Sequence, residues 1–148
     1  MKLDEYLDEF EDLDAEERLE VLMDFGHELP PLGPEHQTLQ NRSDCQIQEC
    51  QTPVYMHVGL EQGTVHLAAH VPEKSPTVRG FVAMLVNGLA GTPAEQVLQI
   101  PDNMPERLGL RDVLGMTRFR GFTGIVAFIK REIRRLQAAA AVDPPSGS

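Results

Sequence analysis

The fold is decided by a run of alternating apolar residues in the middle of the chain, Val54-Tyr55-Met56-His57-Val58-Gly59-Leu60-Glu61-Gln62-Gly63-Thr64-Val65-His66-Leu67-Ala68-Ala69-His70-Val71. In each half of the run every second residue is apolar, which is the period of a β-strand with one buried face. The two halves are separated by Glu61-Gln62-Gly63, a short turn that contains glycine. The run therefore predicts an antiparallel hairpin with one face in the core.

Helices are predicted on both sides of the hairpin, and they are needed because a lone hairpin is marginally stable in water. Upstream, apolar residues recur at three- and four-residue steps and predict two helices: Leu3, Tyr6, Leu7, Phe10 and Leu13, then Leu19, Leu22, Met23 and Phe25. Between these helices Asp14 and Glu17 have the spacing of a capping box. A short third strand is expected near Ile47.

The chain after the hairpin is predicted to be helical. Ser75-Pro76 and Thr92-Pro93-Ala94-Glu95 have the form of helix starts. Short helical turns are expected over 101–114, and one long helix is predicted from a single apolar stripe: Phe122, Ile125, Val126, Ile129, Ile133 and Leu136. The fold class is therefore α+β, a small antiparallel sheet packed against several helices. We expect one domain over 1–140 and a disordered tail over 141–148.

The composition predicts a soluble cytoplasmic protein. The chain has 148 residues, of which 41% are hydrophobic and 24% charged, as in ordinary globular domains. No apolar run reaches the roughly 18 residues that a membrane span needs. The acidic start of the chain lacks the form of a signal peptide, and two cysteines are too few for a secreted disulfide scaffold.

The charge of the chain is unevenly distributed. The net charge is −10, and residues 1–25 hold eleven Asp and Glu against Lys2 and Arg18. Residues 118–136 hold six Lys and Arg against Glu132, a balance of +5. An acidic protein is a poor ligand for nucleic acid, because phosphate binding needs a basic surface. The basic helix could face an acidic partner, but pairing within the chain or simple solvation is the favoured interpretation.

The chemistry of the chain centres on two cysteines in the polar loop before the hairpin, Cys45 and Cys50. The loop could hold them incidentally or join them in a local disulfide. A zinc site is disfavoured, because the cysteine spacing is unusual for zinc. Three histidines are also expected to face solvent on the polar side of the hairpin: His57, His66 and His70. No motif places a general base or an oxyanion hole near either thiol.

The loop around Cys50 resembles a family signature. Glu49-Cys50-Gln51-Thr52-Pro53-Val54-Tyr55 is similar to the Gly-Cys-Gln-Ser-x-Val-Trp signature of the SufE family of sulfur acceptors. Upstream, Phe25-Gly26-His27-Glu28-Leu29-Pro30 resembles the family's Gly-x-x-Leu-Pro helix ending. The hairpin and the helices that follow it occur in the family's order, so the resemblance covers residues 18–138.

This resemblance implies a sulfur carrier rather than an independent enzyme. SufE-like proteins take persulfide sulfur from a pyridoxal-phosphate cysteine desulfurase of the SufS type and stimulate its turnover. They pass the sulfur to the iron–sulfur scaffold built from SufB, SufC and SufD. By residue match Cys50 is the acceptor, with Gln51 and Arg120 in supporting roles. The resemblance implies no cofactor. A metal, a nucleic-acid partner and a membrane partner are not expected, because of the cysteine spacing, the acidic charge and the lack of a long apolar run.

Departures from the signature leave alternatives open. Glu49 stands where glycine is common, and Cys45 is an extra cysteine, for which an inert thiol is favoured over a regulatory one. Asp44 and Glu49 are acidic, and nearby negative charge disfavours a thiolate, so we hypothesise a Cys50 thiol that is sluggish until a partner binds. The alternative functions are a non-catalytic adaptor of a desulfurase-like partner and a thiol enzyme of unknown substrate.

Overall fold

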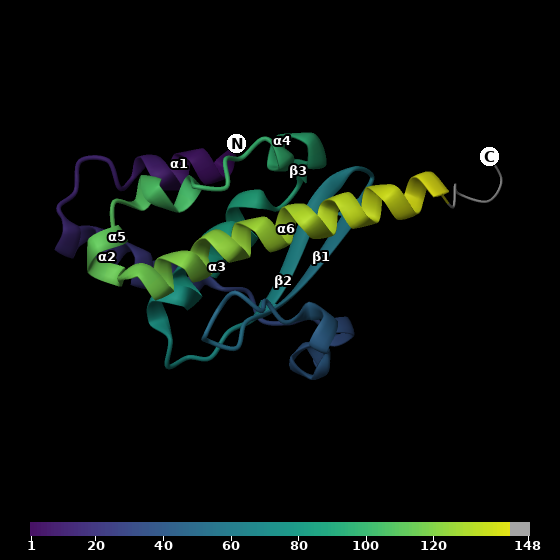
Figure 1. Cartoon of the computed structure of the whole chain (residues 1–148), viewed down its shortest axis with the longest axis horizontal. Helices are drawn as coiled ribbons and strands as arrows, with labels where there is room; N and C mark the ends of the chain where they lie inside the picture. The colour runs from purple at the N-terminus through teal and green to yellow at the C-terminus, as the bar shows by residue number, and fades with distance from the viewer. Residues whose placement is uncertain (143–148) are drawn as a thin grey trace.

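Helices packed on a small antiparallel sheet make up the fold, which a computed structural model describes for residues 1–142 (Figure 1). The helices and strands are α1 (Lys2–Asp8), α2 (Ala15–Phe25), β1 (Tyr55–Glu61), β2 (Thr64–His70), α3 (Pro76–Leu89), β3 (Thr92–Pro93), α4 (Ala94–Leu98), α5 (Arg111–Leu114) and α6 (Met116–Val142). Short 3₁₀ turns connect them: η1 (Gly26–Glu28), η2 (Pro34–His36), η3 (Leu39–Asn41), η4 (Ser43–Cys45) and η5 (Met104–Leu108). The α+β class is confirmed.

The predicted hairpin is present, with β1 and β2 paired from Tyr55–His70 to Glu61–Thr64. The turn places Gln62 at φ 52° and Gly63 at φ 79°, which is the left-handed backbone that tight hairpins need. Most of the alternating apolar residues lie in the core as expected: Val54, Met56, Val58, Val65, Ala69 and Val71 are buried, while Leu60 and Leu67 are partly buried against it.

The third strand lies elsewhere than expected. It is β3, which pairs with the far side of β2 through Thr92 and Val65. Near Ile47 there is only an isolated bridge between Gln46 and Tyr55. The helix start predicted within Thr92-Pro93-Ala94-Glu95 is present, since α4 begins at Ala94, but the side-chain cap expected from Thr92 is not formed. Pairing with the end of β2 provides a tertiary contact that outweighs this local preference.

The core lies between the sheet and two helices, α3 and α6. Helix α3 packs on β2 and helix α6 on β1, and α1 and α2 cover the outer side of α3. In the centre the rings of Phe81 and Phe122 stack with centroids 4.3 Å apart. Gly80 lets α2 approach closely, because a Cβ there would overlap the carbonyl oxygen of Leu22. In Figure 1, α6 crosses in front of the two long strands, β1 and β2.

Two predictions about the ends of helices have different outcomes. The capping box is confirmed, since Asp14 accepts a hydrogen bond from the Glu17 amide at 2.9 Å and Glu17 accepts one from the Asp14 amide at 3.1 Å. The disordered tail was predicted over 141–148. Helix α6 continues to Val142, and the rest of this prediction, 143–148, lies outside the described residues. Over 1–142, no helix is both long enough and apolar enough to cross a membrane.

Candidate functional site at the Cys50 cavity

The cysteine loop, residues 48–53, projects from two fully buried anchors. Ile47 and Val54 are both 0% exposed, and the Ile47 amide donates to the Val54 carbonyl at 2.9 Å. Inside the loop the Cys50 amide is directed back to the Ile47 carbonyl at 3.4 Å. The base of the loop is therefore fixed by the core, while its tip is held by its contacts with α6.

The tip of the cysteine loop lies on two glycines of α6. A Cβ at Gly124 would overlap the Cβ of Glu49 and would lie 2.9 Å from its Cγ. A Cβ at Gly121 would lie 3.3 Å from the Cys50 sulfur. Gly124 therefore requires glycine for the loop to approach the helix this closely, whereas an added Cβ at Gly121 would need its neighbours to give by only a few tenths of an ångström.

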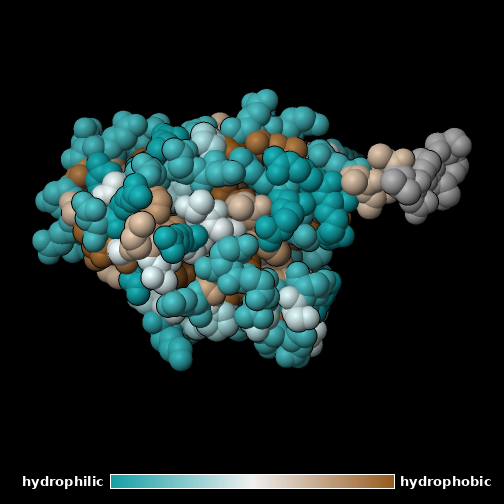
Figure 2. Space-filling model, viewed as in Figure 1, coloured by the Kyte–Doolittle hydropathy of each residue, from teal (hydrophilic) through white to brown (hydrophobic). Residues whose placement is uncertain are grey.

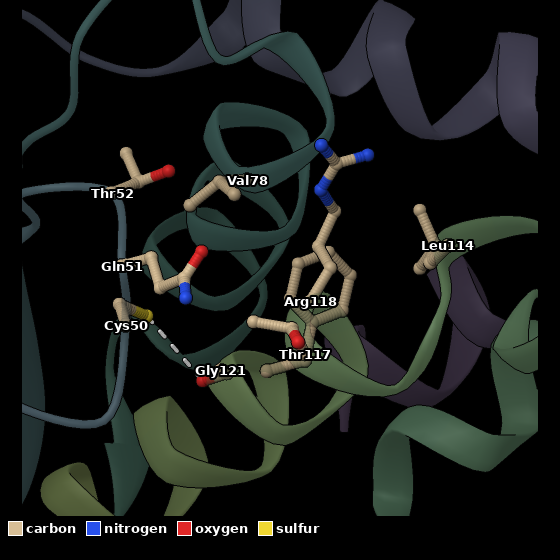
Figure 3. A pocket seen from close by; sticks show the side chains of 9 residues that line it. Cys50, Gln51, Thr52, Val78, Leu114, Thr117, Arg118 and Gly121 are labelled. Carbon is tan, nitrogen blue, oxygen red and sulfur yellow. Dashed lines mark hydrogen bonds between the residues drawn. The ribbon is translucent and has the colours of Figure 1, made fainter.

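The Cys50 thiol opens onto a cavity of about 170 Å³ between the cysteine loop, α3 and α6. The lining residues are Cys50, Gln51, Thr52, Val78, Leu114, Thr117, Arg118, Gly121 and Phe122. Figure 3 shows the Cys50 sulfur directed at Gly121, with the Arg118 side chain on the opposite side of the cavity. A sulfur atom added to Cys50 would thus have a partly open space beside it and a guanidinium across from it.

The cavity keeps the Cys50 thiol neutral. Its sulfur donates to the Gly121 carbonyl oxygen at 3.5 Å, a contact that only the protonated thiol makes. Burial, and after it the negative charge of Glu49, raises the pKa of Cys50 to about 11. The sluggish thiol inferred from the acidic loop is supported in direction, but burial is the larger cause. Asp44 instead pairs with Arg42 at 2.9 Å.

Alkylation of the free protein should follow this raised pKa. At pH 8 about one Cys50 thiol in a thousand is ionised, against about one in four for free cysteine. We expect iodoacetamide labelling of the Cys45→Ser protein to be slow at pH 8 and to rise up to pH 11. Glu49→Gln should accelerate it only about threefold at pH 8, because burial remains. A plateau reached near pH 8 would contradict the burial of the thiol.

The second cysteine lies apart from the cavity. Cys45 is buried at the end of η4, both cysteines are free thiols, and burial raises the pKa of Cys45 as well. Cys45→Ser should therefore leave the labelling rate of Cys50 and its inactivation by peroxide unchanged within about twofold, since a buried neutral thiol reacts slowly. A changed sensitivity to peroxide would instead give Cys45 a regulatory role.

The residues expected to support Cys50 have different positions. Gln51 lines the cavity, whereas Arg120 is exposed on α6 and is absent from the cavity lining. Arg118, not Arg120, is the arginine that lines the cavity, on the side opposite the thiol. Helix α6 begins at Met116, earlier than the apolar stripe starts, and two residues along a helix turn a side chain by about 200°. The apolar stripe sets the phase of this helix and puts Arg118, four residues before Phe122, on the side of the stripe, but the sequence did not show that the helix begins as early as Met116 or that the cysteine loop lies on its two glycines.

The histidines do not gather into a metal site. Among residues 1–142 no three His, Cys, Asp or Glu side chains are arranged to hold a metal ion. His57 is half-buried rather than solvated, because its ring lies 4.4 Å from that of His36 on the loop that covers the outer sheet face. His66 lies 3.5 Å from the Glu61 carboxylate at the hairpin end.

The fold and the site define an α+β protein whose candidate chemistry rests on one loop cysteine. The family described as SufE: Fe-S metabolism associated domain matches residues 4–133, which extends the resemblance into α1. The chain belongs to the SufE family. This membership associates it with iron–sulfur metabolism.

Individual relatives support the family assignment. An uncharacterized SufE-like protein of Mycobacterium tuberculosis is 34% identical over 133 residues, covering 89% of this chain and 91% of the relative. The cysteine desulfuration protein SufE of Plasmodium vivax is 32% identical over 113 residues, covering 75% of this chain and 43% of that protein. The solution structure of a hypothetical protein from Thermus thermophilus has a TM-score of 0.77 at 32% identity, covering 93% of this chain and 96% of the other.

Proposed function

We propose that this chain is a cytoplasmic sulfur carrier that accepts persulfide sulfur on Cys50 from a SufS-type cysteine desulfurase. The observation that carries the proposal is the Cys50 thiol on a family-type loop, facing a cavity that has room for an added sulfur. Membership of the SufE family supports a cysteine desulfurase as the class of partner. The scaffold built from SufB, SufC and SufD is the proposed destination of the sulfur.

The proposed transfer is a thiol exchange that needs no cofactor. The Cys50 thiolate attacks the outer sulfur of the donor persulfide, and a new S–S bond forms on Cys50 as the donor S–S bond breaks. The electron pair of the broken bond leaves on the donor cysteine, which takes up a proton equivalent to the one that Cys50 lost. The same exchange, with Cys50 as the donor, delivers the sulfur onward. No net oxidation occurs in either step.

The resting cavity opposes this chemistry until the donor binds. With a pKa near 11 the Cys50 thiol is a poor nucleophile in the free protein. Contact with the donor must draw the cysteine loop off Gly121 and Gly124, which ends the burial that raises the pKa. Arg118, across the cavity, supplies a positive charge that favours a persulfide anion once the loop returns. The desulfurase is stimulated because its persulfide is removed.

Mass spectrometry of the intact protein tests the proposal. After incubation with a SufS-type desulfurase and cysteine, we expect a mass gain of one sulfur atom, lost on reduction and located at Cys50 by peptide mapping. Free cysteine without desulfurase is the control. A protein that stimulates the desulfurase while its mass stays unchanged would be an adaptor.

The adaptor is the second candidate function, and one observation favours it. A thiol held neutral by burial is compatible with a cysteine that has only a packing role. In that case the loop would contact the desulfurase and stimulate it by shape, and no sulfur would be transferred. Only the carrier function needs the Cys50 sulfur, so a Cys50→Ser substitution distinguishes the carrier from the adaptor.

A further inference from the structure

One side of α6 carries a row of exposed arginines. Arg120, Arg131 and Arg134 are all exposed, and we call them the arginine face. The eleven residues from Arg120 to Arg131 span about three helical turns, so the two side chains point the same way, and Arg134 lies one turn further. Figure 2 shows hydrophilic side chains over the C-terminal half of this helix, on the face nearest the viewer.

The positive charge of α6 is not neutralised by the acidic N-terminus. In residues 1–142 the helix makes three ion pairs: Lys130–Asp102, Arg131–Glu49 and Arg135–Glu132. In α1, Asp4 and Asp8 form their side-chain ion pairs with Arg107 of η5, at 3.2 Å each. The ion pairs of α6 are therefore made within the chain, as the sequence favoured, but none of them joins it to the acidic N-terminus, and the arginine face stays exposed.

The arginine face borders the cysteine loop. Arg131 lies 3.8 Å from the Glu49 carboxylate, immediately before Cys50. On the same helix Gly121 and Gly124 hold the loop, and Arg118 lines the cavity. A protein that contacts the loop to reach the Cys50 sulfur must therefore lie close to these arginines.

We propose that the arginine face is an electrostatic docking surface for an acidic protein surface on the sulfur donor, an inference that rests on the proposed carrier function. A chain of net charge −10 repels an acidic partner except where its own surface is basic. A basic patch beside the reactive thiol therefore favours the one orientation that brings the loop to the donor. A nucleic acid is disfavoured as the occupant, because three arginines on an acidic protein are a small footprint for a phosphate chain.

Docking on the arginine face also acts on the cysteine loop. A donor carboxylate that approaches Arg131 competes with Glu49, whose ion pair is long and exposed and therefore weak. Loss of that contact removes one of the few interactions that hold the tip of the loop on α6. The same encounter that orients the partner thus loosens the loop that carries Cys50.

Charge reversal tests the docking surface. We expect Arg120→Glu/Arg134→Glu to raise the apparent KM for this protein, in desulfurase assays with a SufS-type enzyme, about tenfold at about 50 mM salt. The increase should fall below about threefold at 500 mM salt, where exposed charges are screened. Lys2→Glu, an exposed reversal at the opposite end of the chain, is the matched control and should leave KM unchanged.

The outcomes separate the two proposals. Absence of the sulfur mass gain on wild-type Cys50 would overturn the carrier function itself. A normal mass gain together with an unchanged KM and salt dependence in the double variant would overturn the docking surface alone. Binding of wild type, but not of the double variant, to phosphatidylglycerol vesicles would replace the protein partner with a membrane.

Discussion

Cys50→Ser should abolish sulfur acquisition and with it the stimulation of the desulfurase. A serine hydroxyl cannot form the S–S bond, and its size leaves the cysteine loop and its glycine contacts in place. The expected result is no sulfur mass gain and a desulfurase rate equal to that without this protein. The measurements are intact mass and sulfide release under reductant, with binding to the desulfurase followed in parallel.

Binding and turnover together decide between carrier and adaptor. For a carrier, Cys50→Ser retains its affinity for the desulfurase within about threefold while stimulation is lost, because the docking surface is intact. Cys45→Ser is the matched control, since it removes the other thiol and should behave as wild type. Full stimulation by Cys50→Ser would establish the adaptor and exclude the carrier.

Gly124→Ala should convert the sluggish Cys50 into a reactive thiol. The new methyl group would overlap the Glu49 Cβ, so the cysteine loop must move off α6 and take the sulfur out of the cavity. The pKa of Cys50 should then fall from about 11 toward the ordinary value, and iodoacetamide labelling at pH 8 should rise at least about tenfold.

Stability should change much less than reactivity in Gly124→Ala. Overpacking costs roughly 1–3 kcal/mol, but alanine is about 1 kcal/mol more favourable than glycine inside a helix. Gly88→Ala is the matched control, because its methyl would lie 3.0 Å from the Leu3 backbone, away from the cysteine loop. For the same reasons its Tm should change by a similarly small amount, and the labelling of Cys50 should stay as in wild type. Equal labelling of both variants would mean that Gly124 does not hold the loop.

The sequence predicted the features that depend on neighbours along the chain. The period-two pattern from Val54 to Val71 set the hairpin and its buried face, because a shift of one residue in the register would turn the alternating apolar side chains to the other face. The Asp14–Glu17 cap was predictable because both of its hydrogen bonds close within one helical turn. Cys50 was identified as the candidate thiol from a short motif, without knowledge of the three-dimensional structure.

Features that depend on packing between distant segments were missed. Gly121 and Gly124 would count in sequence only as weak helix formers, and their role exists only because a loop some seventy residues earlier lies on them. Strand β3 is only two residues long, and one of them is a proline, so no alternation of apolar residues could predict it. Arg118 could be distinguished from Arg120 only once the start of α6 and the place of the cysteine loop on it were known.

A thiol held neutral is also a durable one. The thiolate attacks peroxide far faster than the neutral thiol does, so the buried Cys50 of the free protein should resist conversion to sulfinic and sulfonic acid, which ordinary reductants do not reverse. Damage is then confined to the short intervals when the cysteine loop is open. The working lifetime of each molecule under oxidative conditions is therefore set by how many encounters it makes, rather than by how long it has existed in the cell.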